Sequence, residues 1–373
     1  MKILVLTKRQ YMGKDLVDDR FGRFWELPLE LARLGHEVQA IALSYRRRSE
    51  GTFAPSISSS TGSVTWHSVN LFNAPWPGLR RYLRFARERI GAFDPQVIWA
   101  CSDAYHAILG HRLAKNCAAR LVIDLYDNFE SYAATRIPGI LSLFKHAVRA
   151  ADGVSCVSSQ LAQYIGVHYR CPAPVVLLEN AIRADLFLPM EQSICRKHLG
   201  LPDDGKIIGT AGALYESRGI STLYRGFEIL AGEDSKLHLA IAGPRPLKKN
   251  GIPIGARVHD LGILPLETVP VLLNALDVAA ICNRKSSFGR YNYPQKAREI
   301  IACGVPLVAA AVGTMKELLR NRPECLFDPD DPRSLARAIR LQLAKPTKIE
   351  CSVPDWPEMA VKLATFFRQL LDR

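Results

Sequence analysis

The sequence predicts an α/β protein made of two doubly wound domains. Short, continuously apolar runs alternate with helical patterns along the whole chain, and 373 residues suffice for two domains of ordinary size. Strands that are buried on both faces of a parallel sheet read as such continuous runs. The expected strands are residues 2–7, 37–43, 97–101, 121–125, 153–157, 175–178, 207–211, 237–242, 278–281 and 307–311. The expected helices include residues 21–34, 141–150, 221–230, 265–275 and 332–343.

Two prolines in residues 169–174 interrupt this alternation. We therefore expect one domain over residues 1–172 and a second over residues 173–355. The serine-rich stretch 56–63 is expected to be an exposed loop, and a strongly apolar helix is expected over residues 359–371.

Composition excludes several classes of protein. No apolar run approaches the roughly 18 to 20 residues that span a bilayer, and residues 1–6 are too short for the core of a signal peptide. The nine cysteines are scattered, odd in number and never in CxxC spacing, which argues against a disulfide framework and a zinc site. We therefore expect a cytoplasmic protein.

The net charge of +13 is concentrated in the N-terminal half, mainly in residues 46–48 and 80–89. In the second cluster, apolar residues recur at helical spacing and arginines fill the other face. This helix is either a solvated surface helix or a face that attracts anionic lipid headgroups or an acidic acceptor. Nucleic acid is not expected, because no nucleic-acid-binding motif accompanies the charge.

A helix that begins at Pro294 and ends before Gly304 carries cations where a helix normally disfavours them. Arg290, Lys296 and Arg298 cluster near its N-terminus, which itself has a partial positive charge. A bound phosphate group would remove this conflict.

Glu299 lies three residues after Lys296 and shares its helix face. The two side chains form either an intrahelical ion pair or a nucleotide site. In the second case Lys296 faces a diphosphate and Glu299 faces sugar hydroxyls.

Residues 209–219 link a strand to a helix and are rich in glycine. Glycine there lets backbone N–H groups approach a ligand closely, although a tight turn explains the composition equally well. The segment matches neither the P-loop nor the GxGxxG pattern. Arg218, just before the helix, is placed either to pair with a phosphate or to face solvent.

Carboxylates follow two expected strands of the N-terminal half. Asp127 is our first candidate for a ligand-binding carboxylate and Asp103 the second, because doubly wound folds bind ligands beyond the carboxyl ends of their strands. Both could equally be helix caps. Asp124 lies within a strand, and His106 is expected to be a packed or solvated histidine.

Taken together, these residues resemble glycosyltransferase family 4, the retaining sugar-nucleotide transferases of the GT-B fold. That fold consists of two Rossmann-like doubly wound domains that face each other across a cleft. The matching segments follow the family's order: residues 24–38, 151–158, 179–189, 212–219, 264–270, 299–308 and 312–317.

The resemblance implies that the C-terminal domain binds a nucleotide diphosphate sugar and that the N-terminal domain binds a glycan or lipid-linked acceptor. It also implies retention of configuration, no metal, no cofactor beyond the donor, and a C-terminal helix, residues 356–373, that packs back on the N-terminal domain. The expected setting is polysaccharide or glycoconjugate synthesis, either in the cytoplasm or peripherally at the inner face of the membrane. The implied donor-site residues are Gly212, Arg218, Tyr291, Lys296, Glu299 and Gly313. Of these, Arg218 and Lys296 would be catalytic by stabilising the charge on the departing diphosphate, and Asp127 would assist deprotonation or orientation of the acceptor.

The chain departs from the family pattern in four places. Tyr291 occupies the position of a glutamate that faces the donor sugar, and Ala181 and Ala213 replace a glycine and an arginine. The Gly-Gly loop after the first strand is reduced to Gly13. Three alternatives follow: a nucleotide-binding protein without transferase activity, a sugar-nucleotide epimerase, and a membrane-associated scaffold.

Overall fold

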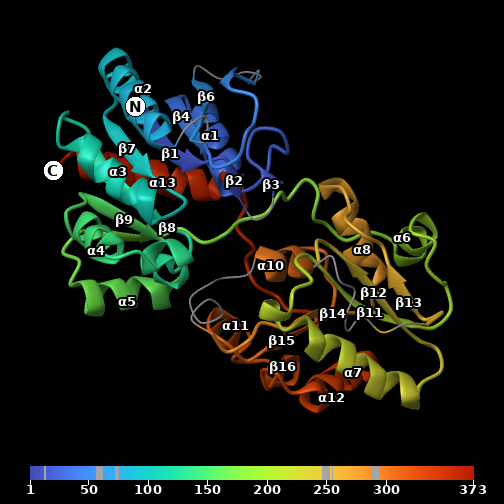
Figure 1. Ribbon diagram of the computed structural model, residues 1–373. Coiled ribbons are helices and arrows are strands. Elements are labelled where there is room, and N and C mark those ends of the chain that lie inside the picture. Colours follow the sequence, from blue (N-terminus) through green and yellow to red (C-terminus); the bar gives the residue numbers. More distant parts are fainter. Residues whose placement is uncertain (12–13, 56–61, 72–74, 246–252, 254, 287–294) are drawn as a thin grey trace. The chain divides into compact units, whose positions relative to one another are not determined.

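The computed structural model describes residues 1–11, 14–55, 62–71, 75–245, 253, 255–286 and 295–373, which form two compact units (Figure 1). The first unit comprises Met1–Asn180 and Trp356–Arg373, and the second comprises Ala181–Asp355. We expected the division at residue 172. It falls at residue 180 because the strand Val175–Leu177 pairs in parallel with a strand of the first unit.

The first unit is built on an eight-stranded sheet of order β10-β9-β8-β7-β1-β4-β6-β5. Every pair is parallel except β5 with β6, as expected for a doubly wound sheet. The strands are β1 (Lys2–Lys8), β4 (Glu37–Ser44), β5 (Gly51–Phe53), β6 (Ser63–Asn70), β7 (Val97–Ala100), β8 (Arg120–Leu125), β9 (Gly153–Cys156) and β10 (Val175–Leu177). A small hairpin of β2 (Gln10–Tyr11) and β3 (Lys14–Asp15) follows β1.

The helices of the first unit are α1 (Arg23–Arg33), α2 (Pro75–Phe93), α3 (Ala104–Ala114), α4 (Ile140–Arg149), α5 (Ser159–Tyr169) and α13 (Trp356–Leu371). The last of these packs against α1 and contributes Phe367 to the core, where its ring lies 6.3 Å from that of Trp99. A Cβ at Gly153 would lie 2.7 Å from Leu370, so β9 and α13 are in direct contact. The C-terminal helix is therefore part of the first unit.

The second unit contains a parallel sheet of order β13-β12-β11-β14-β15-β16. Its strands are β11 (Lys206–Ala211), β12 (Leu237–Ala242), β13 (Val258–Asp260), β14 (Val278–Ile281), β15 (Leu307–Ala310) and β16 (Leu326–Phe327). Its helices are α6 (Gln192–His198), α7 (Ile220–Glu233), α8 (Val269–Ala275), α10 (Gln295–Ala302), α11 (Thr314–Leu318) and α12 (Pro332–Ala344).

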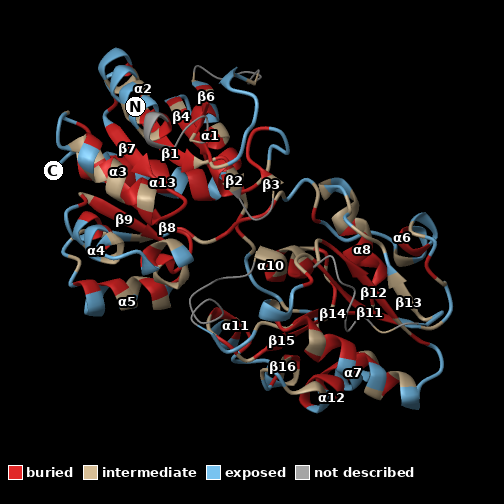
Figure 2. Ribbon diagram, in the orientation of Figure 1, coloured by how far each residue is buried: buried red, intermediate tan, exposed pale blue. Residues whose placement is uncertain are grey.

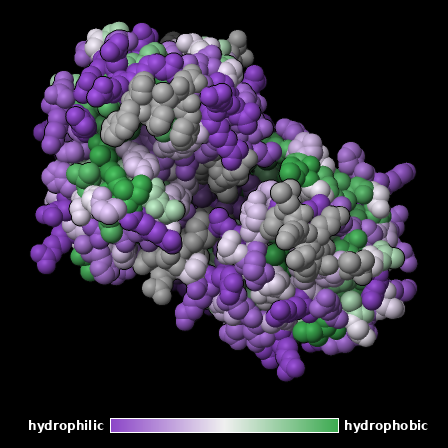
Figure 3. Space-filling model, in the orientation of Figure 1, coloured by the Kyte–Doolittle hydropathy of each residue, from purple (hydrophilic) through white to green (hydrophobic). Residues whose placement is uncertain are grey.

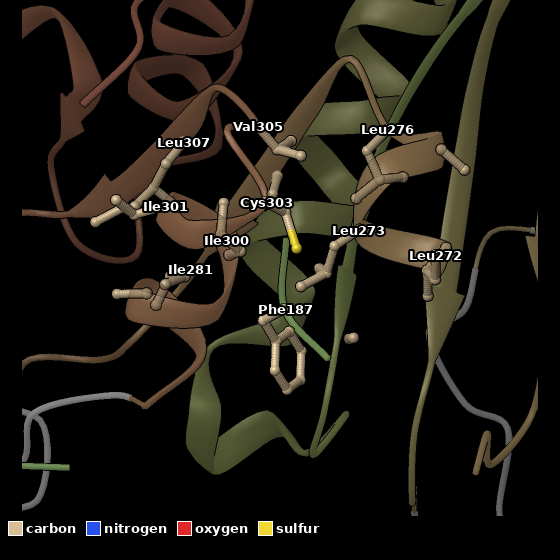
Figure 4. Packing of buried hydrophobic residues seen from close by; sticks show 14 of the residues in the cluster. Phe187, Leu272, Leu273, Leu276, Ile281, Ile300, Ile301, Cys303, Val305 and Leu307 are labelled. Atoms are coloured by element: carbon tan, nitrogen blue, oxygen red, sulfur yellow. The ribbon is translucent and has the colours of Figure 1, made fainter. Parts of the chain in front are cut away.

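Two separate apolar cores cover the two faces of this second sheet. Neighbouring residues of one strand enter different cores: Ile207 packs with α8 and α10, whereas Ile208 packs with α7 and α12. Figure 4 shows part of the first of these cores, with Leu273 of α8 and Ile300 of α10 among the labelled residues. Strands β14 and β15 divide in the same way. Strands that are buried on both faces explain why the sequence reads as unbroken apolar runs, and Figure 2 shows the strands of both units as the most buried elements.

Each sheet has one point where the direction of strand addition reverses. In the first sheet the chain adds β4 and β6 on one side of β1 and then continues with β7 on the other. In the second it adds β12 and β13 on one side of β11 and then continues with β14 on the other. Open α/β sheets bind ligands beyond the carboxyl ends of the strands at this point. Ligand sites are therefore expected after β1 and β7 in the first sheet, and after β11 and β14 in the second.

Candidate functional site

In the second unit, Gly212 follows β11 directly at the reversal point. Its φ of +117° is one that side chains rarely adopt, and a Cβ would lie 3.0 Å from Lys296 Cε and 3.1 Å from Lys296 Nζ. A Cβ at Gly243, after β12, would lie 1.9 Å from the carbonyl oxygen of Gly212. Glycine is therefore required at both positions for the backbone and the Lys296 ammonium to pack this closely.

Lys296 is the second residue of α10, and its Nζ donates a hydrogen bond to Thr210 Oγ1 at 3.2 Å. The pKa of this lysine is lowered to about 8, mainly by burial; the charge of Arg218 acts in the same direction, whereas Cys282 and Glu299 oppose the shift. The site thus holds a poorly hydrated cation beside a glycine backbone. An anion bound here would stabilise the ammonium form.

Glu299 lies one turn further along α10, and its Oε1 accepts a hydrogen bond from Gln295 Nε2 at 3.0 Å. Burial raises the pKa of this carboxyl to about 7, although Gln295 and the charge of Lys296 favour the ionised form. Around neutral pH its carboxyl can either donate or accept a hydrogen bond, which suits contacts with hydroxyl groups.

The turn before α7 carries Arg218 and Gly219. Gly219 has a φ of +75°, and a Cβ there would lie 1.9 Å from the carbonyl oxygen of Cys282. The turn therefore packs directly on the residue that follows β14. Arg284 holds the same region, with its Nε 3.0 Å from Asp330 Oδ1 and its Nη1 3.6 Å from Glu216 Oε1. Arg218 is half-buried here and close enough to Lys296 to affect its pKa.

Gly313, Arg298 and Tyr291 were also expected to contribute to a ligand site in this unit. Gly313 immediately precedes α11, with a φ of +53° that favours glycine. Arg298 is buried, and its Nη1 donates to the carbonyl oxygen of Ser352 at 3.4 Å, so the expectation that it joins a ligand-facing cation cluster is wrong. Tyr291 lies outside the described residues, as do Arg290, Pro294 and Gly13.

In the first unit, Ser102 and Asp103 follow β7 at the reversal point. Ser102 is fully buried with a φ of +80°, and its Oγ accepts a hydrogen bond from the backbone N–H of Lys8 at 2.8 Å. A non-glycine residue in this conformation is uncommon and is often found at functional sites.

Asp103 caps α3 by accepting from the backbone N–H of His106, so its alternative role as a helix cap is realised. Its Oδ1 lies 2.8 Å from His106 Nδ1, and its Oδ2 accepts from Tyr45 Oη at 3.0 Å. Burial opposes ionisation of Asp103, but His106 and Lys8 outweigh it and hold the pKa at about 2. His106 is fully buried, as expected for a packed histidine.

Asp127 follows β8 on the same edge of the sheet and is also buried. Its Oδ1 accepts from the backbone N–H of Asn128 at 2.7 Å, and its Oδ2 accepts from Tyr132 Oη at 2.8 Å. Both carboxylate oxygens are thus engaged within the chain.

Asp124 lies within β8, as expected, and forms a fully buried ion pair with Arg23 at 2.9 Å. Arg23 also donates to Asn180 Oδ1 at 3.1 Å and to the carbonyl oxygen of Leu178 at 3.2 Å. It therefore connects α1, β8 and the last residues before the second unit. The sequence interpretation missed Arg23, because an arginine at the start of an amphipathic helix gives no sign that it is buried.

The basic cluster of residues 80–89 lies on α2, where Arg80, Arg81, Arg84 and Arg87 are exposed and Tyr82 and Ala86 are buried. The described part of this surface is hydrophilic (Figure 3). Within the described part of the chain, no helix is both long and apolar enough to cross a bilayer. Nor do three or more His, Cys, Asp or Glu residues of that part form a group able to hold a metal ion.

Two family models match the chain, and together they cover most of it. Residues 23–181 match the model described as "Glycosyl transferase 4-like domain", and residues 205–345 match "Glycosyl transferases group 1". The first match lies almost entirely in the first unit, and the second contains every described donor-site candidate.

Curated relatives include D-inositol 3-phosphate glycosyltransferases. The protein of Thermobispora bispora is 22% identical over 397 residues, covering 93% of this chain and 89% of the relative. That of Geodermatophilus obscurus is 26% identical over 269 residues, covering 67% of this chain and 57% of the relative.

Solved structures show the same fold at low sequence identity. Sucrose-phosphate synthase from Thermosynechococcus elongatus superposes with a TM-score of 0.80 at 18% identity, over 100% of this chain and 99% of that one. Anabaena HepE in complex with UDP gives 0.68 at 18% identity, over 100% and 96%.

Proposed function

The chain belongs to glycosyltransferase family 4 and has the GT-B fold, and from this premise we propose that it is a retaining hexosyltransferase that uses a nucleotide diphosphate sugar. Its acceptor in this proposal is a glycan or a lipid-linked sugar, and its product enters a polysaccharide or glycoconjugate. It requires no metal.

One observation carries this proposal: the Lys296 ammonium packs against Gly212 at the reversal point of the second sheet. Departure of a nucleoside diphosphate builds negative charge on its phosphates. A poorly hydrated cation placed beforehand at that position stabilises this charge without reorganising in the transition state. Burial destabilises the charged form of Lys296, which is why its pKa is lowered. The negative charge of a bound diphosphate offsets this destabilisation.

The neighbouring groups complete the proposed donor site. Arg218 supplies a second positive charge, and the backbone N–H groups near Gly212 and Gly313 face the phosphates. Glu299 binds the ribose hydroxyls from the same face of α10 as Lys296. Tyr291 is proposed to lie near the donor sugar.

The acceptor is proposed to bind the first unit at the carboxyl ends of β1, β7 and β8, with Asp127 assisting deprotonation or orientation of the acceptor. The exposed arginines of α2 support a second proposal, that the enzyme works in the cytoplasm and associates with anionic membranes. Sedimentation with vesicles that contain phosphatidylserine, compared with phosphatidylcholine vesicles, tests this association.

The donor is identified by thermal shift of the full chain against UDP-, GDP-, dTDP- and CMP-sugars. The sugar nucleotide that stabilises the protein most is then incubated with candidate acceptors, and the anomeric configuration of the product is read by NMR. A product of inverted configuration contradicts the retaining mechanism. Conversion of the donor into another sugar nucleotide without acceptor indicates an epimerase, and stabilisation without turnover indicates a nucleotide-binding protein.

A further inference from the structure

Four polar side chains form a continuous hydrogen-bonded chain at the carboxyl edge of the first sheet. Lys8 Nζ donates to Tyr126 Oη at 3.4 Å, Tyr126 Oη lies 3.1 Å from Tyr132 Oη, and Tyr132 Oη donates to Asp127 Oδ2 at 2.8 Å. Lys8 is the last residue of β1, so the chain begins at the reversal point of this sheet. None of Lys8, Tyr126 and Tyr132 is a residue that the sequence interpretation singled out.

The direction of these hydrogen bonds follows from chemistry. Burial raises the pKa of Tyr132 far above its ordinary value, so its hydroxyl stays protonated and donates a hydrogen bond to the Asp127 carboxylate. A hydroxyl has only one hydrogen, so the bond between the two tyrosines uses the hydrogen of Tyr126. The oxygen of Tyr126 then accepts from Lys8. Every group of the chain therefore donates toward Asp127.

Lys8 is the end of this chain that can meet a ligand. Its ammonium is half-buried, 5.9 Å from the ring centre of Tyr126 and 5.5 Å from that of Tyr132. An ammonium has three N–H donors, and among the described residues one of them is hydrogen-bonded, to Tyr126. The other two can donate to the oxygen atoms of a bound molecule.

The charges around Lys8 indicate which oxygen atoms suit it. Burial lowers the pKa of Lys8, and the charges of Asp103 and Asp127 oppose this shift, so two carboxylates lie close enough to affect the ammonium. One cation between two carboxylates is a poor site for a further anion. Hydroxyl oxygens accept N–H donors without adding charge, and flanking aromatic rings are compatible with the C–H faces of a sugar.

We propose that Lys8 is the acceptor-contacting residue of the first unit and donates to the hydroxyl oxygens of a neutral polyol. Asp127 acts through Tyr132 and Tyr126 as a positioning residue, since both of its oxygens are already engaged. Of the two roles proposed above for Asp127, this assigns orientation of the acceptor. The inference rests on the proposed function only in calling the bound polyol the acceptor.

The test is binding of neutral sugars to the full chain, measured by saturation-transfer difference NMR. The probes are glucose and myo-inositol, each compared with its monophosphate. Three variants each remove one polar group of the hydrogen-bonded chain: Lys8→Met, Tyr126→Phe and Tyr132→Phe. Two matched controls lie outside the hydrogen-bonded chain. Lys2→Met removes a cation that is on the same strand as Lys8 and lies over the Phe93 ring. Tyr164→Phe removes a hydroxyl that donates to Glu130.

We expect Lys8→Met to weaken binding of the neutral probe about tenfold or more, as for loss of a hydrogen bond from a charged group. Tyr126→Phe and Tyr132→Phe should weaken it several-fold, and both controls should bind as the wild type does. Adding Asp127→Asn to Tyr132→Phe should produce little further loss, because the two residues act in series. Affinity for UDP, in the second unit, should be unchanged throughout, which separates positioning from general loss of structure.

Two results would overturn the inference: the wild type binds no neutral probe or binds only the monophosphates, or the Lys8 variant binds the neutral probe normally. Failure of the proposed function gives a different pattern. In that case the Lys8-dependent binding of the polyol persists, while no donor sugar is transferred to any acceptor.

Discussion

The carboxyl edges of the two sheets occupy the same topological position, but different kinds of contact hold them together. At the second sheet, glycines 212, 219 and 243 bring backbone segments close together, and Gly212 packs against the Lys296 ammonium. At the first sheet, Asp103, Asp127 and their neighbours engage one another through side-chain hydrogen bonds. The difference suits two kinds of ligand. A diphosphate needs backbone N–H groups and positive charge, whereas a polyol needs hydrogen-bonding groups whose orientation is fixed.

The largest expected effect is on the stability of the first unit. Arg23→Met removes the partner of the buried Asp124 carboxylate, and loss of one member of a buried ion pair costs about 3 to 5 kcal/mol. Urea unfolding should show this loss in the free energy of unfolding. Arg33→Met is the control, because Arg33 lies on the same helix in a partly exposed pair with Glu30 and should change the free energy by less than about 1 kcal/mol. Equal effects of the two variants would show that the buried pair contributes nothing special.

The next effect concerns catalysis in the second unit. Lys296→Ala should lower kcat by about 10² to 10³, the loss typical of removing one group that stabilises transition-state charge. Lys206→Ala is the matched control, because Lys206 lies on β11 at the opposite end of the strand and is paired with Asp277. Near-normal turnover of the Lys296 variant would remove the central element of the donor site.

Gly212→Ala tests whether the second site depends on backbone geometry. The new Cβ would meet the Lys296 side chain in a strained backbone conformation, and we expect UDP affinity, measured by calorimetry, to fall about 10- to 100-fold. Gly232→Ala, in an open part of α7, should be neutral or stabilise by up to about 1 kcal/mol. Unchanged UDP affinity in the Gly212 variant would show that close approach of the backbone is not needed.

Glu299→Gln should weaken UDP binding about tenfold while it slows the bound-state reaction less, because the carboxylate is proposed to bind the ribose in both states. Comparison of KM for the donor with kcat distinguishes these effects, and Glu233→Gln, in a surface pair with Arg340, is the control. A fall in kcat without a change in donor affinity would argue for a role at the reacting sugar instead.

The smallest effect is a pH dependence that has opposite signs for stability and binding. Lys296 has a pKa of about 8 in the folded chain, below its ordinary value of 10.5, so between these values the unfolded chain binds more protons and stability rises with pH. UDP prefers the ammonium form, so its affinity should fall about fourfold between pH 7 and 8.5 for a single group of this pKa. Calorimetry of wild type and Lys296→Met checks this, and a slope that persists in the variant would assign it to another group.

For physical reasons, the sequence points more directly to residues at the carboxyl edge of the second sheet than to those at the carboxyl edge of the first. Continuous apolar runs predicted β1, β4 and most later strands. Strand β6 was missed because it contains His67 and Ser68, which are polar but buried. His67 is hydrogen-bonded to Thr52, and Ser68 accepts from Arg9. Gly212 could be proposed from the sequence because its backbone conformation disfavours other residues, so a glycine at the end of a strand is informative. The contacts of Lys8 depend on tyrosines that follow another strand, so no local pattern reveals them.

Because α13 belongs to the first unit, the order in which the two units are synthesised differs from the order in which they can fold. The second unit is one continuous segment, so a ribosome completes Ala181–Asp355 while the first unit still lacks Trp356–Arg373. Until α13 is made, the apolar face of α1 and the Trp99 ring lack the partners that Phe367 and its neighbours provide. The unit that begins first can therefore finish after the second, and nascent chains should keep its core accessible until residues 356–373 have been synthesised.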